Sequence, residues 1–174
     1  MVWLRLRQMT ISRRLAKVHD TGVSLIELLV VLSIMGIFTT LVIPGLRGLM
    51  MDNQRDTAIR NIVVALAYAR SEAIKRNQSV TVCPFQEGAA CRAVPHWEHG
   101  WLVYLDANAN GQRDVGELVL RQHEDRSEGM TLRGVKTRVV YKPHGGSEGW
   151  NGTIKVCDQR GAPYARSIIL SNSG

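Results

Sequence analysis

The chain has 174 residues and a formal net charge of +7 at pH 7, from 22 Lys and Arg against 15 Asp and Glu. This length allows one ordinary domain with an anchor or tail and excludes two full domains. Hydrophobic residues make up 45% and charged residues 21%, close to globular averages, so the composition excludes a wholly disordered chain. Basic residues are concentrated ahead of one long apolar stretch, which argues against a fully soluble cytoplasmic enzyme.

The apolar stretch comes first in chain order. Val23 to Leu46 is 24 residues long and contains one charged residue, Glu27. About 20 apolar helical residues cross the hydrocarbon core of a bilayer, so residues 23–46 predict a transmembrane helix. The alternative, a buried helix of a soluble core, fits less well because the apolar side chains surround the whole helix. Residues 1–22 are basic, and the positive-inside rule therefore predicts a single-pass inner-membrane protein with its remaining residues in the periplasm.

The start of this stretch carries a recognisable motif. Residues 21–32, Thr-Gly-Val-Ser-Leu-Ile-Glu-Leu-Leu-Val-Val-Leu, resemble the processing motif of type IV pilins and type II secretion pseudopilins. The resemblance implies that a prepilin peptidase cuts after Gly22, removes the leader 1–22 and methylates Val23, where the family usually has phenylalanine. It also implies that Glu27 pairs with the N-terminal amine of a neighbouring subunit. A carboxylate in an apolar span needs such a partner, because an unpaired buried charge is costly.

Helical periodicity continues beyond the apolar stretch. Residues 47–78 predict an amphipathic periplasmic helix, and Pro44-Gly45 predicts a bend at its start. From residue 79 the pattern alternates with period two, which predicts a β-rich globular head over 79–174. A helix followed by strands indicates an α+β fold, in which a long N-terminal helix packs on an antiparallel sheet. The predicted strands are 80–82, 101–105, 117–121, 138–141, 153–156 and 166–170.

Several head segments resemble the FimT/GspH branch of the same family, which contains minor pilins and minor pseudopilins. The resembling segments are 82–84 with Cys91, 100–106, the loop 108–117 and the closing residues 166–174. The resemblance implies a minor pilin that is incorporated into a type IV pilus and supports pilus assembly or DNA uptake in natural transformation. The alternative is a minor pseudopilin of a type II secretion system. The implied partners are other pilins or pseudopilins, the prepilin peptidase, the inner membrane and, for DNA uptake, DNA.

Three cysteines follow the predicted span: Cys83, Cys91 and Cys157. An oxidising periplasm permits disulfides, and three cysteines allow at most one bridge. We favour Cys83–Cys91, which closes a short loop containing Pro84 and Gly88. Two alternatives stay open: a Cys83–Cys157 bridge, or three cysteines that serve as small buried apolar residues.

The loop from Asp106 to Glu117 matches the calcium-binding pattern of EF-hands. In that pattern Asp106, Asn108, Asn110 and Glu117 supply side-chain oxygens, and Gln112 supplies its carbonyl. The segments around the loop are strands, whereas an EF-hand needs helices. The second interpretation is therefore a hairpin in which Asn and Gly satisfy the turn geometry. Calcium is the one cofactor that the sequence suggests.

No arrangement of nucleophile, base and orienting residue points to catalysis. His96, His99, His123 and His144 fit no metalloprotease or hydrolase spacing. The sequence therefore predicts that the protein is not an enzyme.

Positive charge is concentrated near the end of the chain. Residues 130–174 contain seven basic residues against two acidic ones, a net +5. A clustered basic face suits phosphate backbones, although a solvated basic surface explains the charge equally well. Some FimT-type pilins bind DNA through a Gly-Arg-x-Arg tail, a motif not found in the residues up to Gly174. The DNA-contact candidates are Arg160 and Arg166 first, followed by Lys136, Arg138, Lys142 and Lys155.

Overall fold

A computed structural model describes residues 22–125 and 129–174, so most of the predicted leader 1–22 lies outside the described residues. One long α-helix, α1 (Leu25–Arg76), comes first, and strands follow it. The described strands are β1 (Val80–Gln86), β2 (Ala90–Cys91), β3 (Gly100–Leu105), β4 (Val119–Glu124), β5 (Thr131–Gly134), β6 (Val139–Tyr141), β7 (Gly152–Cys157) and β8 (Arg166–Leu170). A short 3₁₀ helix, η1 (Ala162–Tyr164), lies between β7 and β8.

Helix α1 has defined caps at both ends. At its start, the Ser24 hydroxyl accepts a hydrogen bond from the Glu27 backbone N–H at 3.2 Å, which satisfies one of the free donors of the first turn. At its end, Asn77 adopts a positive φ of 51°. The N–H of Asn77 then bonds the carbonyl of Ile74, and the N–H of Gln78 bonds that of Ala73. This is a Schellman motif, which turns the chain out of the helix and into β1.

The chain divides into two compact units between Pro44 and Gly45, and α1 contributes to both. The helix remains helical through Pro44, where the sequence predicts a bend. It contains a window with a mean hydropathy of 2.5, none of it buried within the chain, and is long and apolar enough to cross a membrane.

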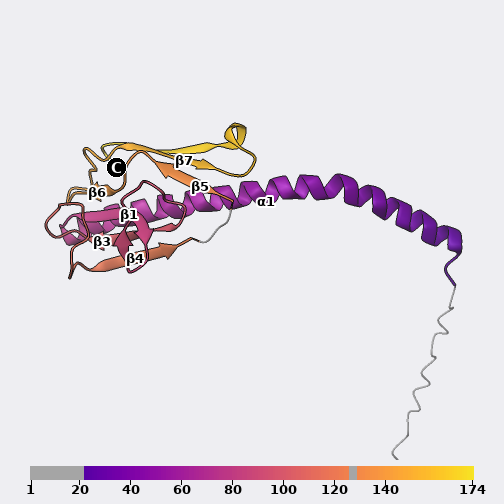
Figure 1. Cartoon of the computed structure of the whole chain (residues 1–174), viewed down its shortest axis with the longest axis horizontal. Helices are drawn as coiled ribbons and strands as arrows, with labels where there is room; N and C mark the ends of the chain where they lie inside the picture. The colour runs from indigo at the N-terminus through magenta and orange to yellow at the C-terminus, as the bar shows by residue number, and fades with distance from the viewer. Residues whose placement is uncertain (1–21, 126–128) are drawn as a thin grey trace, which may run out of the picture. The chain divides into compact units, whose positions relative to one another are not determined.

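The strands form two antiparallel sheets. The larger sheet has the order β2-β1-β3-β4, and β6 also pairs with β1. The smaller sheet has the order β5-β7-β8. The strands gather around the C-terminal half of α1 (Figure 1). The predicted α+β fold, a long N-terminal helix packed on an antiparallel sheet, is confirmed.

The strand predicted at 80–82 extends to Gln86. Three further strands differ from the sequence predictions. The strand predicted at 117–121 begins later, at Val119, because the Glu117 carboxylate bonds the N–H groups of Ala107 and Asp114 and belongs to the preceding loop. The short strands β2 and β5 were not predicted. Both are short and have few buried side chains, so neither has the run of alternating apolar residues that marks a strand.

The core lies between one face of α1 and the two sheets. This helix face is rich in alanine, and Ala65, Ala69 and Ala73 are each at most 2% exposed. Small side chains allow the helix to approach the sheets closely. Val63 and Ile74, which share the apolar periodicity in the sequence, lie on the outer face and are 44% and 53% exposed. The larger core side chains packed here include Ile62, Trp97, Trp101, Val103, Leu132 and Val156.

We predict that Ile62→Ala lowers the free energy of unfolding of the head by about 2–5 kcal/mol, because it opens a cavity under a fully buried residue. The neighbouring Val63→Ala is the matched control and should cost less than about 1 kcal/mol, since Val63 is largely exposed. Denaturant titration of the full chain in detergent, followed by the fluorescence of the buried Trp97 and Trp101, measures both values. Equal losses in the two variants would show that α1 does not pack on the sheets through this face.

Candidate functional site

The predicted cleavage site lies just before α1. Gly22 and Val23 are non-helical and exposed, with Val23 71% exposed. A Cβ atom placed on Gly22 would meet nothing within 4 Å. The fold itself therefore does not require glycine at this position, and a need for glycine would come from the processing enzyme.

Glu27 lies in the first turn of α1. The amino end of a helix carries partial positive charge, which favours a carboxylate there. The neighbouring Leu25, Ile26 and Leu28 are 54–79% exposed in the isolated chain. Within residues 22–125 and 129–174, no ion-pair partner of Glu27 is seen. A lipid environment would thus leave this carboxylate dependent on a partner from outside the chain.

The disulfide joins Cys83 on β1 to Cys91 on β2. Cys83 is fully buried, and Cys157 on β7 is a free thiol. The predicted Cys83–Cys91 pair is confirmed, and the alternative Cys83–Cys157 pair is wrong. The bond fixes the β1–β2 hairpin, whose second strand has only two residues.

The loop between β3 and β4 is organised by three carboxylates. The Asp106 carboxylate is buried and accepts hydrogen bonds from the N–H groups of Asn110 and Gly111 and from the Thr81 hydroxyl. The Asp114 carboxylate accepts from the side-chain amides of Asn108 and Asn110. The Glu117 carboxylate bonds the N–H groups of Ala107 and Asp114. The loop is therefore closed by its own hydrogen bonds.

This arrangement bears on the calcium prediction. The side-chain oxygens of Asn108 and Asn110 accept the N–H groups of Asn110 and Gln112, so the proposed ligands Asp106, Asn108, Asn110 and Glu117 all have partners within the loop. In the described part of the chain, no group of three or more His, Cys, Asp or Glu side chains is arranged to hold a metal ion. Calcium binding stays a prediction, to be tested by direct titration of the metal-free protein.

The six DNA-contact candidates do not share one surface. Lys155 on β7 and Arg166 on β8 point to opposite faces of the smaller sheet, because Arg166 is opposite Val156 rather than Lys155. Lys142 pairs with Glu148 at 3.4 Å. Hydrogen bonding from His144, together with backbone contacts, lowers the pKa of Glu148 to about 2. Lys136 is exposed between β5 and β6, and the Arg138 guanidinium bonds the Gly111 carbonyl.

Arg160, the first DNA candidate, is instead part of an ion cluster formed by Asp52, Arg55, Asp158 and Arg160. Its guanidinium lies 2.6 Å from Asp158 and 2.7 Å from Asp52. Arg55 is 5% exposed; it lies 3.0 Å from Asp52 and donates to the Tyr164 carbonyl at 3.1 Å. The cluster connects α1 to the turn between β7 and β8.

The cluster changes the ionisation of its members. Hydrogen bonds from Arg160 hold the pKa values of Asp158 and Asp52 below their ordinary range, and both carboxylates raise the pKa of Arg160. The positive charge of Arg160 is thereby balanced inside the protein. Sequence reasoning missed this role, although Asp52 and Arg55 have the i, i+3 spacing of a helical ion pair.

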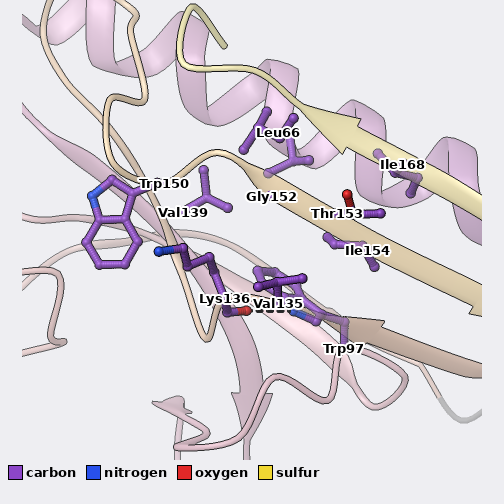
Figure 2. Close-up of a pocket in the computed structure, with 11 residues that line it drawn as sticks. Leu66, Trp97, Val135, Lys136, Val139, Trp150, Gly152, Thr153, Ile154 and Ile168 are labelled. Carbon is purple, nitrogen blue, oxygen red and sulfur yellow. Dashed lines mark hydrogen bonds between the residues drawn. The ribbon is translucent and has the colours of Figure 1, made fainter.

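An apolar pocket lies between the two sheets and α1 (Figure 2). The indole N–H of Trp97 donates to the Lys136 carbonyl at its edge, at 3.3 Å, and Trp150 and Val139 line it. Its volume is about 20 Å³, room for about one water molecule. The pocket is a small packing gap rather than a ligand site.

Comparison with known proteins matches both parts of the chain. Residues 58–174 match the family model of the type II transport protein GspH, and residues 19–43 match the prokaryotic N-terminal methylation motif. The pilin-like protein PilA1 of Thermus thermophilus is 38% identical over 98 residues, which cover 55% of this chain. The chain spans about half the length of that relative, 54%.

Two crystal forms of the type IV minor pilin FimU of Pseudomonas aeruginosa share the fold. The first has a TM-score of 0.56 at 18% identity and covers 71% of this chain and 87% of FimU. The second has a TM-score of 0.52 at 17% identity, with 68% and 87% covered. At this level of identity the likeness establishes the fold alone.

We predict that replacing both bridged cysteines, Cys83→Ser with Cys91→Ser, lowers the free energy of unfolding by about 2–3 kcal/mol. The bridge spans a sequence separation of eight residues, and its removal restores the entropy of that open loop to the unfolded chain. Denaturant titration of the full chain under non-reducing conditions gives the value. Cys157→Ser is the control, and non-reducing peptide mapping should find Cys83–Cys91 intact in it. An unchanged midpoint in the double variant would contradict the prediction.

We predict that the ion cluster stabilises the head at neutral pH and loses this effect in acid. The pKa values of Asp52 and Asp158 are lower in the folded state than the ordinary value near 4, so their contribution is present above about pH 4 and disappears as the pH falls through the lowered values. Asp158→Asn should therefore be less stable than wild type at pH 7, and the difference should shrink towards about pH 3. Glu87→Gln, in an exposed turn, serves as the control. A pH-independent difference would exclude this linkage.

Proposed function

The chain belongs to the GspH family of type II transport proteins, and we propose that it is a minor subunit of a type IV pilus. In this proposal a prepilin peptidase cuts after Gly22 and methylates Val23, and the protein then joins the filament through the first half of α1. The protein is pilin-like and structural rather than an enzyme, as its family and fold indicate.

The contrast between the two halves of α1 carries the proposal. In the second half, one face packs into the core. In the first half, apolar side chains are exposed on every side; Leu28, Leu32, Ile34 and Phe38 are 49–63% exposed. A surface of this kind is not stable in water and needs either lipid or other apolar helices around it. Lipid before assembly, and the apolar helices of neighbouring subunits afterwards, would cover these side chains.

The proposed orientation places the head in the periplasm. Five basic residues in positions 1–22 favour a cytoplasmic N-terminus. The Cys83–Cys91 disulfide supports an oxidising compartment for the head, because cytoplasmic thiols are kept reduced. Both observations agree with a single pass through the inner membrane.

The alternative function is that of a minor pseudopilin in a type II secretion system, which needs the same processing and topology. The names of the relatives do not separate the two functions: one is a type IV minor pilin and one a pilin-like protein, while the family model refers to type II transport. Deletion of the gene separates the two functions. Loss of surface pili with normal protein secretion supports the pilus, and the reverse result supports the secretion system.

The sequence also predicts a role in DNA uptake, and the described residues support this role less than they support filament assembly. The basic candidates are spread over different surfaces, and Arg160 is balanced by two carboxylates. We therefore place DNA contact second to filament assembly.

Two substitutions test the assembly proposal at successive steps. Gly22→Ala should block removal of the leader, and intact-mass spectrometry of the membrane fraction should find the uncut chain. Gly36→Ala is the matched control, because a Cβ at Gly36 likewise meets nothing within 4 Å. It should be cut normally. A leader that stays on the wild-type chain in a pilus-competent cell would overturn the proposed processing.

Glu27→Ala should be cut and inserted normally, yet be reduced at least about tenfold in sheared filaments. The expected loss follows from removing one partner of a buried ion pair, which costs several kcal/mol. Glu87→Ala removes an exposed carboxylate outside α1 and should assemble as wild type does. Immunoblots of sheared and cell-bound fractions give the ratio. Wild-type incorporation of the Glu27 variant would mean that assembly does not depend on this carboxylate.

A further inference from the structure

Three arginines line one cleft in the head. Arg92 follows β2, Arg113 lies in the loop between β3 and β4, and Arg138 precedes β6. The cleft has a volume of about 390 Å³, within the usual range of ligand sites. Its lining contains no aspartate or glutamate; the lining residues are 90–93, 111–113, 137 and 138.

The sheet topology explains why these residues meet. Strands β2 and β6 both pair with β1, with Cys91 opposite Phe85 and Val139 opposite Val82. The space between the two short strands lies along the middle of β1. The disulfide holds one wall of this space, since Cys91 is both bridged and part of the lining.

The loop of residues 106–117 forms another wall. The Arg138 guanidinium donates to the Gly111 carbonyl and lies 5.6 Å from the centre of the Trp150 ring. Gly111 has a φ of +71°, and a Cβ there would lie 3.0 Å from the Arg138 side chain. The internal hydrogen bonds of the loop and the Arg138–Gly111 hydrogen bond hold the wall in place.

Among the described residues, the three guanidinium groups have no acidic partner. Each arginine is half-buried, and across residues 22–125 and 129–174 no carboxylate is seen within 4.0 Å of any of them. By contrast, Arg55, Arg133 and Arg160 all have carboxylate partners. The Nε atom of Arg113 is buried and has no hydrogen-bond acceptor. Three like charges and an unsatisfied donor in one cleft are costly unless an anion is bound.

We propose that this cleft, formed by Arg92, Arg113 and Arg138, binds a phosphate group. The planar guanidinium donates two parallel hydrogen bonds to an oxyanion, a geometry that phosphate and carboxylate share. Phosphate matches three positive charges better, because it presents more acceptor oxygens and a phosphate monoester carries close to two negative charges at neutral pH. The volume has room for more than a single ion, so the group can be part of a larger molecule.

This site is distinct from the assembly surface on the first half of α1 and does not depend on the proposed filament function. Only Arg138 belongs to the six DNA candidates named from the sequence. Inorganic phosphate and the phosphodiester of a nucleic acid are two sources of the same chemistry, and the experiment separates them.

The test uses the full chain in non-ionic detergent and a Tris chloride buffer. Isothermal titration with inorganic phosphate, and separately with a short single-stranded oligonucleotide, measures binding. Arg113→Gln is the decisive variant because the buried Nε of Arg113 has no hydrogen-bond partner among the described residues that the substitution would remove. It should weaken binding at least about tenfold, the loss expected for one charge-assisted hydrogen-bonding group. Arg166→Gln, an exposed arginine outside the lining, is the matched control and should bind as wild type does.

Saturable binding of either probe that is weakened by Arg113→Gln and unchanged by Arg166→Gln supports the site. Phosphate alone would identify a small-anion ligand, and binding of the oligonucleotide would extend the source to a phosphodiester. Absence of binding by both probes overturns the proposal. So does binding that Arg113→Gln leaves unchanged. Succinate, titrated in the same way, is the carboxylate probe; its binding without binding of phosphate would overturn the proposal and assign the cleft to a carboxylate partner. Circular dichroism and non-reducing peptide mapping confirm that each variant is folded and bridged.

Discussion

The close packing of one alanine-rich face of α1 against two sheets is the contact on which the rest of the head depends. Ala58, Ala65, Ala69 and Ala73 bring the helix backbone near the strands, and Ile62 fills the space that remains between them. Because this face of α1 covers the larger sheet, the sheet needs no other layer on that side. The same helix that serves as the anchor in the proposed function is therefore also the centre of the core.

In the proposed function the first half of α1 lies in lipid and the second half packs in the head. From Ala58 onward one face of α1 is buried against the head, whereas before Pro44 the apolar side chains of α1 are exposed among the described residues. Glu27 also needs a partner from outside the chain, because a carboxylate among exposed leucines and isoleucines is favourable only beside a positive charge. In the proposed function, the neighbouring subunits of the filament would supply the missing partners of this half of the helix.

The sequence predicted what depends on local pattern and missed what depends on distant contacts. The long apolar helix, the motif around Gly22 and Glu27, and the Cys83–Cys91 pair all follow from residues close together in the chain. The ion cluster could not be predicted, because Asp52 and Arg160 are 108 residues apart and only the fold brings them together. For the same reason the sequence places Arg160 among the DNA candidates, from its charge and its position near the closing strand. The cleft between β2 and β6 was missed because it depends on two strands sharing β1, and β2 is too short to be seen in the pattern.

The position of the ion cluster has a mechanical consequence. Asp52 and Arg55 lie in the early part of the helix segment that belongs to the head, and they hold the turn that carries Asp158 and Arg160. A force along the axis of α1 would act in shear on the ion cluster and on the alanine-rich face of the helix at the same time. Separation would then require many contacts to break at once, instead of one after another as in peeling. A subunit built in this way resists tension best along the direction of its own helix.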